Sequence, residues 1–227
     1  MNAGFIKSIV FFCIGIMFSL IAKGQLGVAY FFPEKGAFSF PVAPFYYSYP
    51  VQPVKYLKLI PTGSIYSIGG MSVNGIPPGF DNSKPLMGPF YALALSFMPA
   101  LSIPVRNVDI DIGAGYFGAY QFFQKINYEN LNRMLQKYEG WDACSSDFTY
   151  KNNISHGFIF GLTVTIWIND NLAISPGLGY YLGGSKLDLK GTYTGGVLQN
   201  TVETKYIEFP GTRLNFRGFE VQLGVSF

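Results

Sequence analysis

Hydrophobic residues recur at every second position in several stretches of the chain. The last stretch is the clearest, because its apolar side chains run from Phe219 to Phe227 and alternate with glycine, serine, Glu220 and Gln222. Residues 157–168 and 172–183 repeat the pattern on either side of an Asn-Asp-Asn turn. Successive side chains of a β-strand point to opposite faces, so this alternation predicts strands with one apolar face. The other face is small, hydroxylated or amide-bearing.

The alternation predicts eight strands, at about 26–32, 37–49, 55–69, 88–98, 105–122, 155–168, 172–183 and 213–227. We expect a bulge where Pro61-Thr62-Gly63 interrupts the third strand. Pro41 and Pro44 fall in the second strand, which leaves open that part of 25–53 is irregular or lies inside the fold. A charged hairpin at 186–194 and 199–209 is expected to project above the rim; within the wall it would raise the count to ten.

The connections between these strands alternate in length. Short connections are predicted around 50–54, 99–104 and 169–171, and long ones around 70–87, 123–154 and 184–212. Short turns at one end and long loops at the other are typical of membrane barrels, and lipid excludes unpaired strand edges. The predicted fold is therefore all-β: an eight-stranded antiparallel transmembrane β-barrel with short periplasmic turns and long extracellular loops.

The N-terminus has the composition of an export signal. Lys7 precedes an apolar run from Ser8 to Ile21, and small residues stand at Ala22 and Gly24. We interpret residues 1–24 as a cleaved secretory signal peptide and 25–227 as one barrel domain; the alternative is an N-terminal membrane anchor. Cleavage removes Lys7 and Lys23 and no acidic residue, so the formal charge falls from +3 to +1.

Composition narrows the class further. Only 13% of the residues are charged and 18% are aromatic, whereas soluble domains carry about 25% charged residues. This excludes a disordered chain, a coiled coil and a nucleic-acid binder with a basic face. One cysteine, Cys144, remains beyond the signal segment, so no internal disulfide is possible there.

Taken together, these features resemble the small outer-membrane β-barrel proteins of Gram-negative bacteria. The alternating C-terminal strand is similar to the signal that the barrel-assembly machinery reads, carried here by Phe219, Val221, Leu223, Val225 and Phe227. The resemblance implies an outer-membrane location, with membrane lipid and the assembly machinery as partners. The class includes tethers, adhesins, pores, secretion accessories and lipid-modifying enzymes, so the resemblance does not select a function.

Four charged residues are predicted to face the barrel interior. Alternation assigns Asp109, Asp111 and Glu220 to the inward face, and Lys58 is the inward cation. An eight-stranded barrel is narrow enough for side chains to fill it. We expect a polar network that plugs the interior; the alternative is a narrow pore for protons or small solutes.

The first alternative to a structural or accessory barrel is a lipid-modifying enzyme. His156 is the one histidine of the chain, and Ser155 precedes it. A serine nucleophile, a histidine base and an acid such as Asp142 or Asp147 can be named. Adjacent residues of a strand point to opposite faces, however, so Ser155 and His156 are weak catalytic candidates. No metal site or cofactor is predicted.

The loop at 123–154 is the most distinctive connection. Residues 127–138 have helical spacing; Tyr138 is the last residue of this segment, and Trp141 follows it. The helix either packs over the barrel mouth or presents a surface to a partner protein, with Tyr138 and Trp141 as anchors. We therefore predict a structural or accessory barrel that presents extracellular loops for interaction.

Overall fold

The structure is a computed structural model that describes residues 24–39, 45–151, 153–197 and 202–226. The predicted signal segment lies outside these residues except for Gly24, and so do Pro41, Pro44 and Phe227. The elements in chain order are β1 (Gln25–Pro33), β2 (Gly36–Ser39), β3 (Phe45–Ser48), β4 (Val51–Val54), β5 (Leu57–Met71), β6 (Val73–Asn74), β7 (Phe90–Val105), β8 (Val108–Phe122), α2 (Tyr128–Glu139), β9 (Ala143–Thr149), β10 (Ser155–Asn169), β11 (Leu172–Lys186), β12 (Leu189–Gly196), β13 (Glu203–Phe209) and β14 (Arg213–Ser226).

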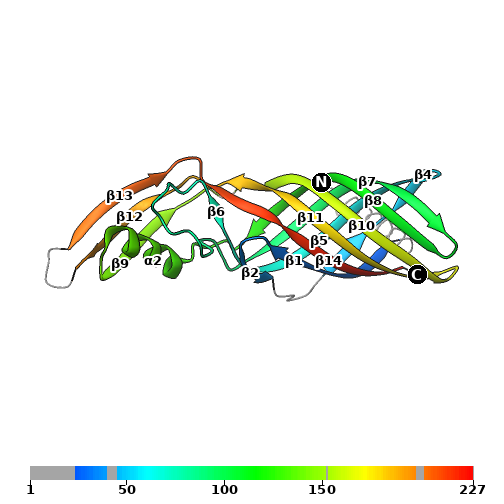
Figure 1. The fold of residues 1–227 in the computed structure, drawn as a ribbon, viewed down its shortest axis with the longest axis horizontal. Coiled ribbons are helices and arrows are strands. Elements are labelled where there is room, and N and C mark those ends of the chain that lie inside the picture. Colours follow the sequence, from blue (N-terminus) through cyan, green and yellow to red (C-terminus); the bar gives the residue numbers. More distant parts are fainter. Residues whose placement is uncertain (1–23, 40–44, 152, 198–201, 227) are drawn as a thin grey trace, which may run out of the picture.

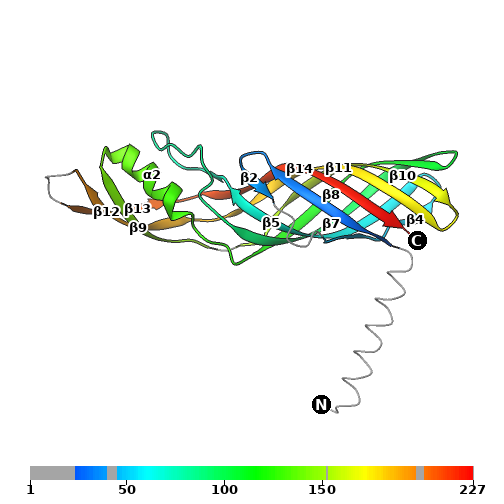
Figure 2. The same cartoon turned by 90° about the horizontal axis from the view of Figure 1, so that it is seen from below.

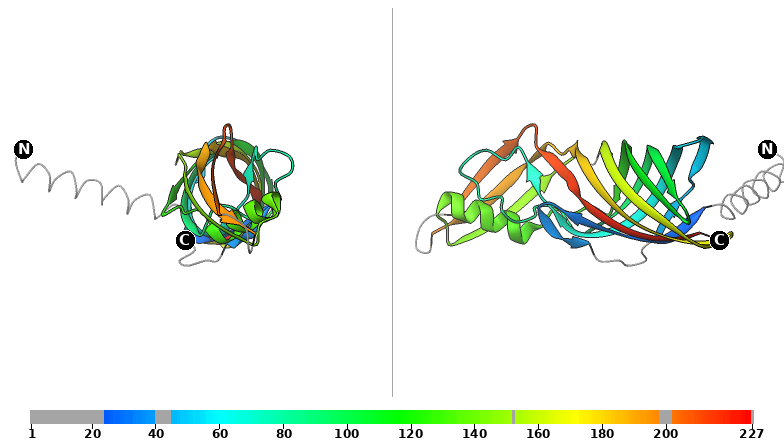
Figure 3. Two further views of the ribbon diagram at one scale, coloured as in Figure 1. Left: turned by 90° about the vertical axis from the view of Figure 1, so that its left-hand side faces the viewer. Right: turned by 45° about the vertical axis from the view of Figure 1, so that its right-hand side comes forward.

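Eight of these strands close into a ring. Their order is β1-β3-β5-β7-β8-β10-β11-β14, and β14 pairs back with β1 from Gln25↔Ser226 to Pro33↔Gly218. All neighbours in the ring are antiparallel. Figure 3 shows the ring along its axis in the left view. The prediction of an eight-stranded antiparallel barrel is confirmed, and the hairpin β12–β13 is not part of the wall.

The wall of the ring is apolar on the outside. Along β10, side chains alternate between buried inward positions and exposed outward ones, and Phe158 is 58% exposed. The ten steps from Phe158 to Ile168 span about 33 Å of strand, or about 25 Å of barrel height at a tilt of ~40°. The exposed apolar side chains of the wall include Tyr91, Leu95, Phe97, Leu101, Ile103, Ile112, Tyr116, Phe160, Ile166, Leu178, Phe219, Val221 and Leu223. We call this surface the apolar belt.

The prediction of a turn at 99–104 is wrong. Strand β7 continues through Pro99 and Pro104 to Val105, and the connection to β8 is only Arg106 and Asn107. The β5 ladder runs past Pro99 without a shift, while the β8 pairing is interrupted between Phe97↔Tyr116 and Ala100↔Gly113. A proline removes one donor from a ladder. Strand β7 therefore loses ladder pairing with β8 at this point, and its register with both β5 and β8 is unchanged.

Two further expectations near the N-terminus are corrected. The pairing of β5 with β7 has no register shift from Leu57 to Ile68, so there is no bulge at 61–63. The predicted second strand at 37–49 is divided into β2 and β3, and residues 40–44 between them lie outside the described residues. Both pieces pair with β5, so together they occupy one place beside it.

A folded unit stands beyond one end of the ring. It consists of α2 and a separate sheet of order β13-β12-β9, which we call the loop unit (Figures 1 and 2). The opposite end of the barrel, where β14 ends, carries the short connections at 106–107 and 170–171. We call these the loop end and the turn end. In the described part of the chain, no helix has the length and apolarity that a membrane crossing requires.

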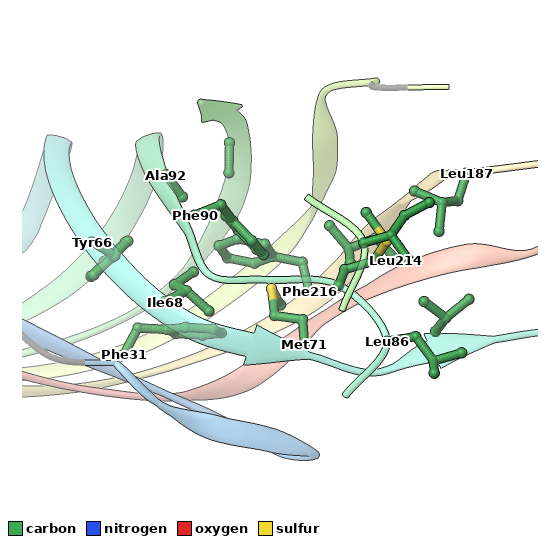
Figure 4. Packing of buried hydrophobic residues seen from close by; sticks show 14 of the residues in the cluster. Phe31, Tyr66, Ile68, Met71, Leu86, Phe90, Ala92, Leu187, Leu214 and Phe216 are labelled. Atoms are coloured by element: carbon green, nitrogen blue, oxygen red, sulfur yellow. The ribbon is translucent and has the colours of Figure 1, made fainter. Parts of the chain in front are cut away.

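One hydrophobic core joins the barrel to the loop unit. It begins inside the ring at Phe31 and Phe216, passes Met71 and Leu86 at the loop end, and continues to Leu187 (Figure 4). The same cluster includes the buried face of α2, formed by Leu131, Met134 and Leu135. The loop unit is therefore anchored on the ring by packing as well as by its chain connections.

Candidate functional site

The lumen near the turn end holds a buried ionic cluster. Lys58 of β5 is 8% exposed, and its Nζ donates to Asp109 Oδ2 at 3.1 Å and to Asp111 Oδ2 at 3.0 Å. Both aspartates come from β8, where they are two residues apart and so share the inward face. A water-accessible cavity of about 210 Å³ lies beside Lys58 and Asp109 at this end.

A second polar group stands deeper in the lumen. Glu220 of β14 is 2% exposed and accepts hydrogen bonds from the hydroxyls of Tyr66 and Tyr181, the latter at 3.1 Å. The two tyrosine hydroxyls are 3.3 Å apart. The structure thus separates the four predicted inward residues into two groups: Lys58 with both aspartates, and Glu220 with two tyrosines.

An aromatic layer closes the lumen on the loop-end side of Glu220. Phe31 stacks on Phe216 with 4.8 Å between ring centroids, and Phe117 meets Tyr181 edge-on at 4.8 Å. All four side chains are at most 1% exposed. Between this layer and the ionic cluster, the cavity that Glu220 lines measures only about 20 Å³, which is room for about one water molecule.

Ser155 and His156 lie on opposite faces of β10. Ser155 Oγ is buried inside, where it accepts from Gln121 Nε2 at 2.9 Å and donates to Ser185 Oγ at 3.1 Å. His156 faces outward, and its Nδ1 is 2.6 Å from the hydroxyl of Tyr116. The structure does not bring this serine and histidine together as a nucleophile and its base.

The helix α2 is well defined by local signals. Asn127 caps its N-terminus by accepting from the Asn130 N–H at 3.1 Å, and Gly140 ends it in the left-handed conformation with φ 70°. Glycine adopts that conformation at little cost. Tyr138 is 50% exposed at the end of the helix, and its ring stacks on Phe80 with 3.9 Å between centroids.

Trp141 lies among charged and aromatic neighbours of the loop unit. Its ring contacts Tyr193 at 5.6 Å between centroids, and Lys205 Nζ stands 5.1 Å from the ring centroid. Lys205 also donates to Glu139 Oε2 at 2.6 Å, and Tyr193 donates to Glu139 Oε1 at 2.7 Å. The structure therefore brings Tyr138 and Trp141 to one end of α2, with Tyr138 the more exposed.

The charges around Glu139 shift the titration of neighbouring groups. The hydrogen bond from Lys205, together with that from Tyr193, lowers the pKa of Glu139, although partial burial opposes the shift. Burial raises the pKa of the Cys144 thiol, and the negative charge of Glu139 adds to that rise. Cys144 is a free cysteine on β9. In the described residues, no group of three or more His, Cys, Asp or Glu side chains could hold a metal ion.

The residues of the predicted assembly signal lie on β14. Phe219, Val221 and Leu223 point outward and are 61%, 43% and 47% exposed, Val225 is half-buried, and Phe227 lies outside the described residues. In the ring, β14 has β11 on one side and β1 on the other, so its backbone is the last to be paired in chain order.

Sequence reasoning missed the tyrosines that bind Glu220 and the serine–glutamine group around Ser155. Alternation places Tyr66 and Tyr181 inward, but no spacing in the sequence shows that they meet across the lumen. Gln121 and Ser185 reach Ser155 from the neighbouring strands β8 and β11, and only the register of those pairings brings the three side chains together.

Several solved structures resemble the fold of this chain. The chain is similar to the crystal structure of the outer membrane protein OprG from Pseudomonas aeruginosa, with a TM-score of 0.48 and 8% sequence identity over 89% of this chain and 92% of that one. No family model and no curated protein sequence matches the chain.

Proposed function

We propose that this protein is an outer-membrane β-barrel of structural or accessory type, which presents its loop unit to a partner at the cell surface. The apolar belt supports the membrane location. Its height of about 25 Å agrees with the apolar band of outer-membrane barrels. A soluble monomer rarely exposes a contiguous apolar patch larger than a few hundred Å², whereas this belt extends over five of the eight ring strands, β7, β8, β10, β11 and β14.

The filled lumen argues for a role outside transport. The aromatic layer of Phe31, Phe117, Tyr181 and Phe216 separates the turn end from the loop end, and each side chain in it is at most 1% exposed. Several polar side chains below it hydrogen-bond to one another, as in the bond from Gln222 Nε2 to Thr163 Oγ1 at 3.2 Å. These contacts rigidify the barrel and leave no wide path for a solute.

The observation that carries the proposal is that the long connections are folded. Two of them supply α2, β9, β12 and β13, and these elements share one hydrophobic core with the ring. Ordering so many residues costs about 1–2 kcal/mol of backbone entropy per residue, and burial of the core offsets this cost. A rigid scaffold that positions ordered loops is the usual arrangement for recognition. Tyr138, which is 50% exposed and close to Trp141 in the sequence, is the proposed aromatic anchor on this unit.

We also propose that the barrel is assembled by strand addition, in which β14 pairs with a sheet edge of an assembly factor. An unpaired strand can add to an open sheet edge of an assembly factor through its backbone, with alternate side chains supplying specificity. The outward row of Phe219, Val221 and Leu223 suits this role, because these residues face lipid once the ring is closed.

Site-specific photo-crosslinking in the producing cells tests this function. A photoreactive phenylalanine analogue replaces Tyr138 in one variant and Phe97, which is 51% exposed on the apolar belt, in the control. We expect a discrete protein adduct from position 138 and only lipid adducts from position 97. Protein adducts of equal yield from position 97 would contradict the membrane placement, and absence of any adduct from position 138 would contradict the partner.

A further inference from the structure

Charged side chains on the outward face of the ring strands gather in one place. Within the described ring strands, Lys186 of β11 and Arg213 and Arg217 of β14 are the outward-facing Lys, Arg, Asp or Glu residues, while Lys58, Asp109, Asp111 and Glu220 face the lumen. We call Lys186, Arg213 and Arg217 the cationic patch. All three lie toward the loop end, and no acidic residue shares that face.

The positive charges of the cationic patch repel one another, and no acidic side chain compensates for them. Lys186 and Arg213 are directly opposite each other in the β11–β14 register, and like charges in that position destabilise a sheet. Arg217 is four residues further along β14 on the same face, about 13 Å from Arg213 along the strand. All 13 Asp and Glu residues lie in the described part of the chain, and none of their carboxylate oxygens lies within 4.0 Å of a side-chain nitrogen of the patch.

The patch borders a groove of about 810 Å³. Its other lining residues include His156 and Tyr120, and its floor includes Gly184, which pairs with His156 and Asn215. A side chain at Gly184 would meet the Leu214 carbonyl oxygen at 2.2 Å, so this stretch of floor is bare backbone. The groove is thus a hollow on the outside of the wall with cations along one side.

The groove begins where the apolar belt ends. Arg217 pairs with Leu182, and the next outward pair toward the turn end is Phe219 with Tyr180, whose rings are 4.9 Å apart. Aromatic side chains mark the interface level of membrane barrels. The cations therefore stand at the height of lipid headgroups, and the apolar wall beneath them can contact the acyl chains of the same lipid.

We propose that this groove binds the phosphorylated headgroup of a membrane lipid. Guanidinium groups match phosphate oxygens with paired hydrogen bonds, and a phosphate between Lys186 and Arg213 would relieve their mutual repulsion. Arg217 stands far enough away to bind a second phosphate of the same headgroup. A basic pocket at the interface level is a recognised form of anionic-lipid binding. This inference rests on the membrane placement proposed above.

Native mass spectrometry of the full-length protein in a neutral detergent tests the groove. The probes are diphosphorylated lipid A, the same lipid with its phosphates removed, and inorganic phosphate as a competitor. We expect the wild type to retain the diphosphorylated lipid and to bind the dephosphorylated form at least tenfold more weakly. Arg213→Gln/Arg217→Gln should weaken binding of the diphosphorylated lipid at least tenfold, while Lys84→Gln/Lys190→Gln, an equal charge change on exposed lysines outside the groove, should not.

A charge reversal separates lipid binding from folding. Lys186→Glu places an acid opposite Arg213, so its barrel should be at least as heat-stable as the wild type in detergent and yet lose the lipid. Equal binding of both lipid forms, equal binding by the double arginine variant, or full competition by millimolar phosphate would overturn the proposal. Heat-modifiable gel mobility reports the barrel independently, so loss of that mobility shift in the wild type would count against the membrane placement itself.

Discussion

The ionic cluster in the lumen allows a quantitative test of how much buried ion pairs contribute to the free energy of unfolding of the barrel. Lys58 is the partner of two carboxylates, at 3.1 Å and 3.0 Å, and Asp111 is 3% exposed. At an effective dielectric constant of about 20, each contact supplies about 5 kcal/mol of attraction, most of which compensates for the cost of burying the charges. Lys58→Met removes the attraction and leaves the carboxylates buried. We expect a loss of about 3–5 kcal/mol in the free energy of unfolding.

The double variant Lys58→Met/Asp111→Asn tests whether an uncompensated buried charge causes the loss of stability in Lys58→Met. It removes the more deeply buried orphan charge, so it should recover more than half of the loss, because removing both partners costs less than removing one. Asp109 has 20% of its side chain exposed and retains access to water. Lys190→Met, at an exposed cation of β12, is the control and should change the stability by at most about 0.5 kcal/mol.

Urea unfolding in lipid vesicles measures these differences. Trp167 Nε1 lies 3.3 Å from Asp109 Oδ2, so tryptophan fluorescence reports the cluster as well as the barrel. The reasoning would be refuted if Lys58→Met unfolded within about 1 kcal/mol of the wild type, which is a loss that ordinary substitutions produce. A double variant no more stable than Lys58→Met would refute the assignment of the loss to an uncompensated charge.

Four further outcomes are expected. In planar bilayers the wild type should show no single-channel conductance, and a reproducible current would contradict the closed lumen. His156→Ala should leave the lipid composition of the membrane unchanged in mass spectra, because Ser155 lies on the other face of β10 from His156. Altered acyl chains in this variant would support a lipid-modifying enzyme. The pKa of Glu139 is lowered in the folded protein, so its bond with Lys205 stabilises the loop unit above about pH 4.5 and is lost as the pH falls below that value. Hydrogen exchange over α2 should therefore accelerate below about pH 4.5, and the acceleration should be smaller in Glu139→Gln. Alkylation of Cys144 should be slow at neutral pH and rise with pH, and Glu139→Gln should speed it by lowering the pKa of the thiol; a rate independent of both would contradict the assignment.

The architecture was predictable because alternation is a property of each strand alone. Phe158 and Phe219 point outward and Asp111 and Glu220 inward in the structure, as their positions along β10, β8 and β14 require. A barrel has one inside and one outside, so a correct parity within each strand fixes the face of every side chain. The helix at 127–138 could be predicted for the same reason, since its apolar spacing and its stop at Gly140 are local signals.

The remaining features depend on contacts between strands that are distant in sequence. Prolines at 99 and 104 indicate a turn, yet a ladder with β5 on one side holds Pro99 within a strand. The meeting of Lys186 with Arg213 depends on the β11–β14 register, which no composition reveals. The loop unit was foreseen as a helix and a hairpin, but its third strand, β9, pairs with β12 only after the loops are brought together.

The position of β14 sets the order in which this molecule can be completed. Toward the turn end, β14 pairs with β11 on one side and β1 on the other and so closes the ring. Toward the loop end, its residues Leu214 and Phe216 are fully buried in the core that supports the loop unit. The hairpin β12–β13 precedes it directly, and β6 pairs with it near Arg213. Until this final strand docks, the core beneath the loop unit lacks two of its members, and the cationic patch lacks two of its three residues. A chain stalled during insertion would therefore display neither surface, and the proposed recognition would depend on completed assembly.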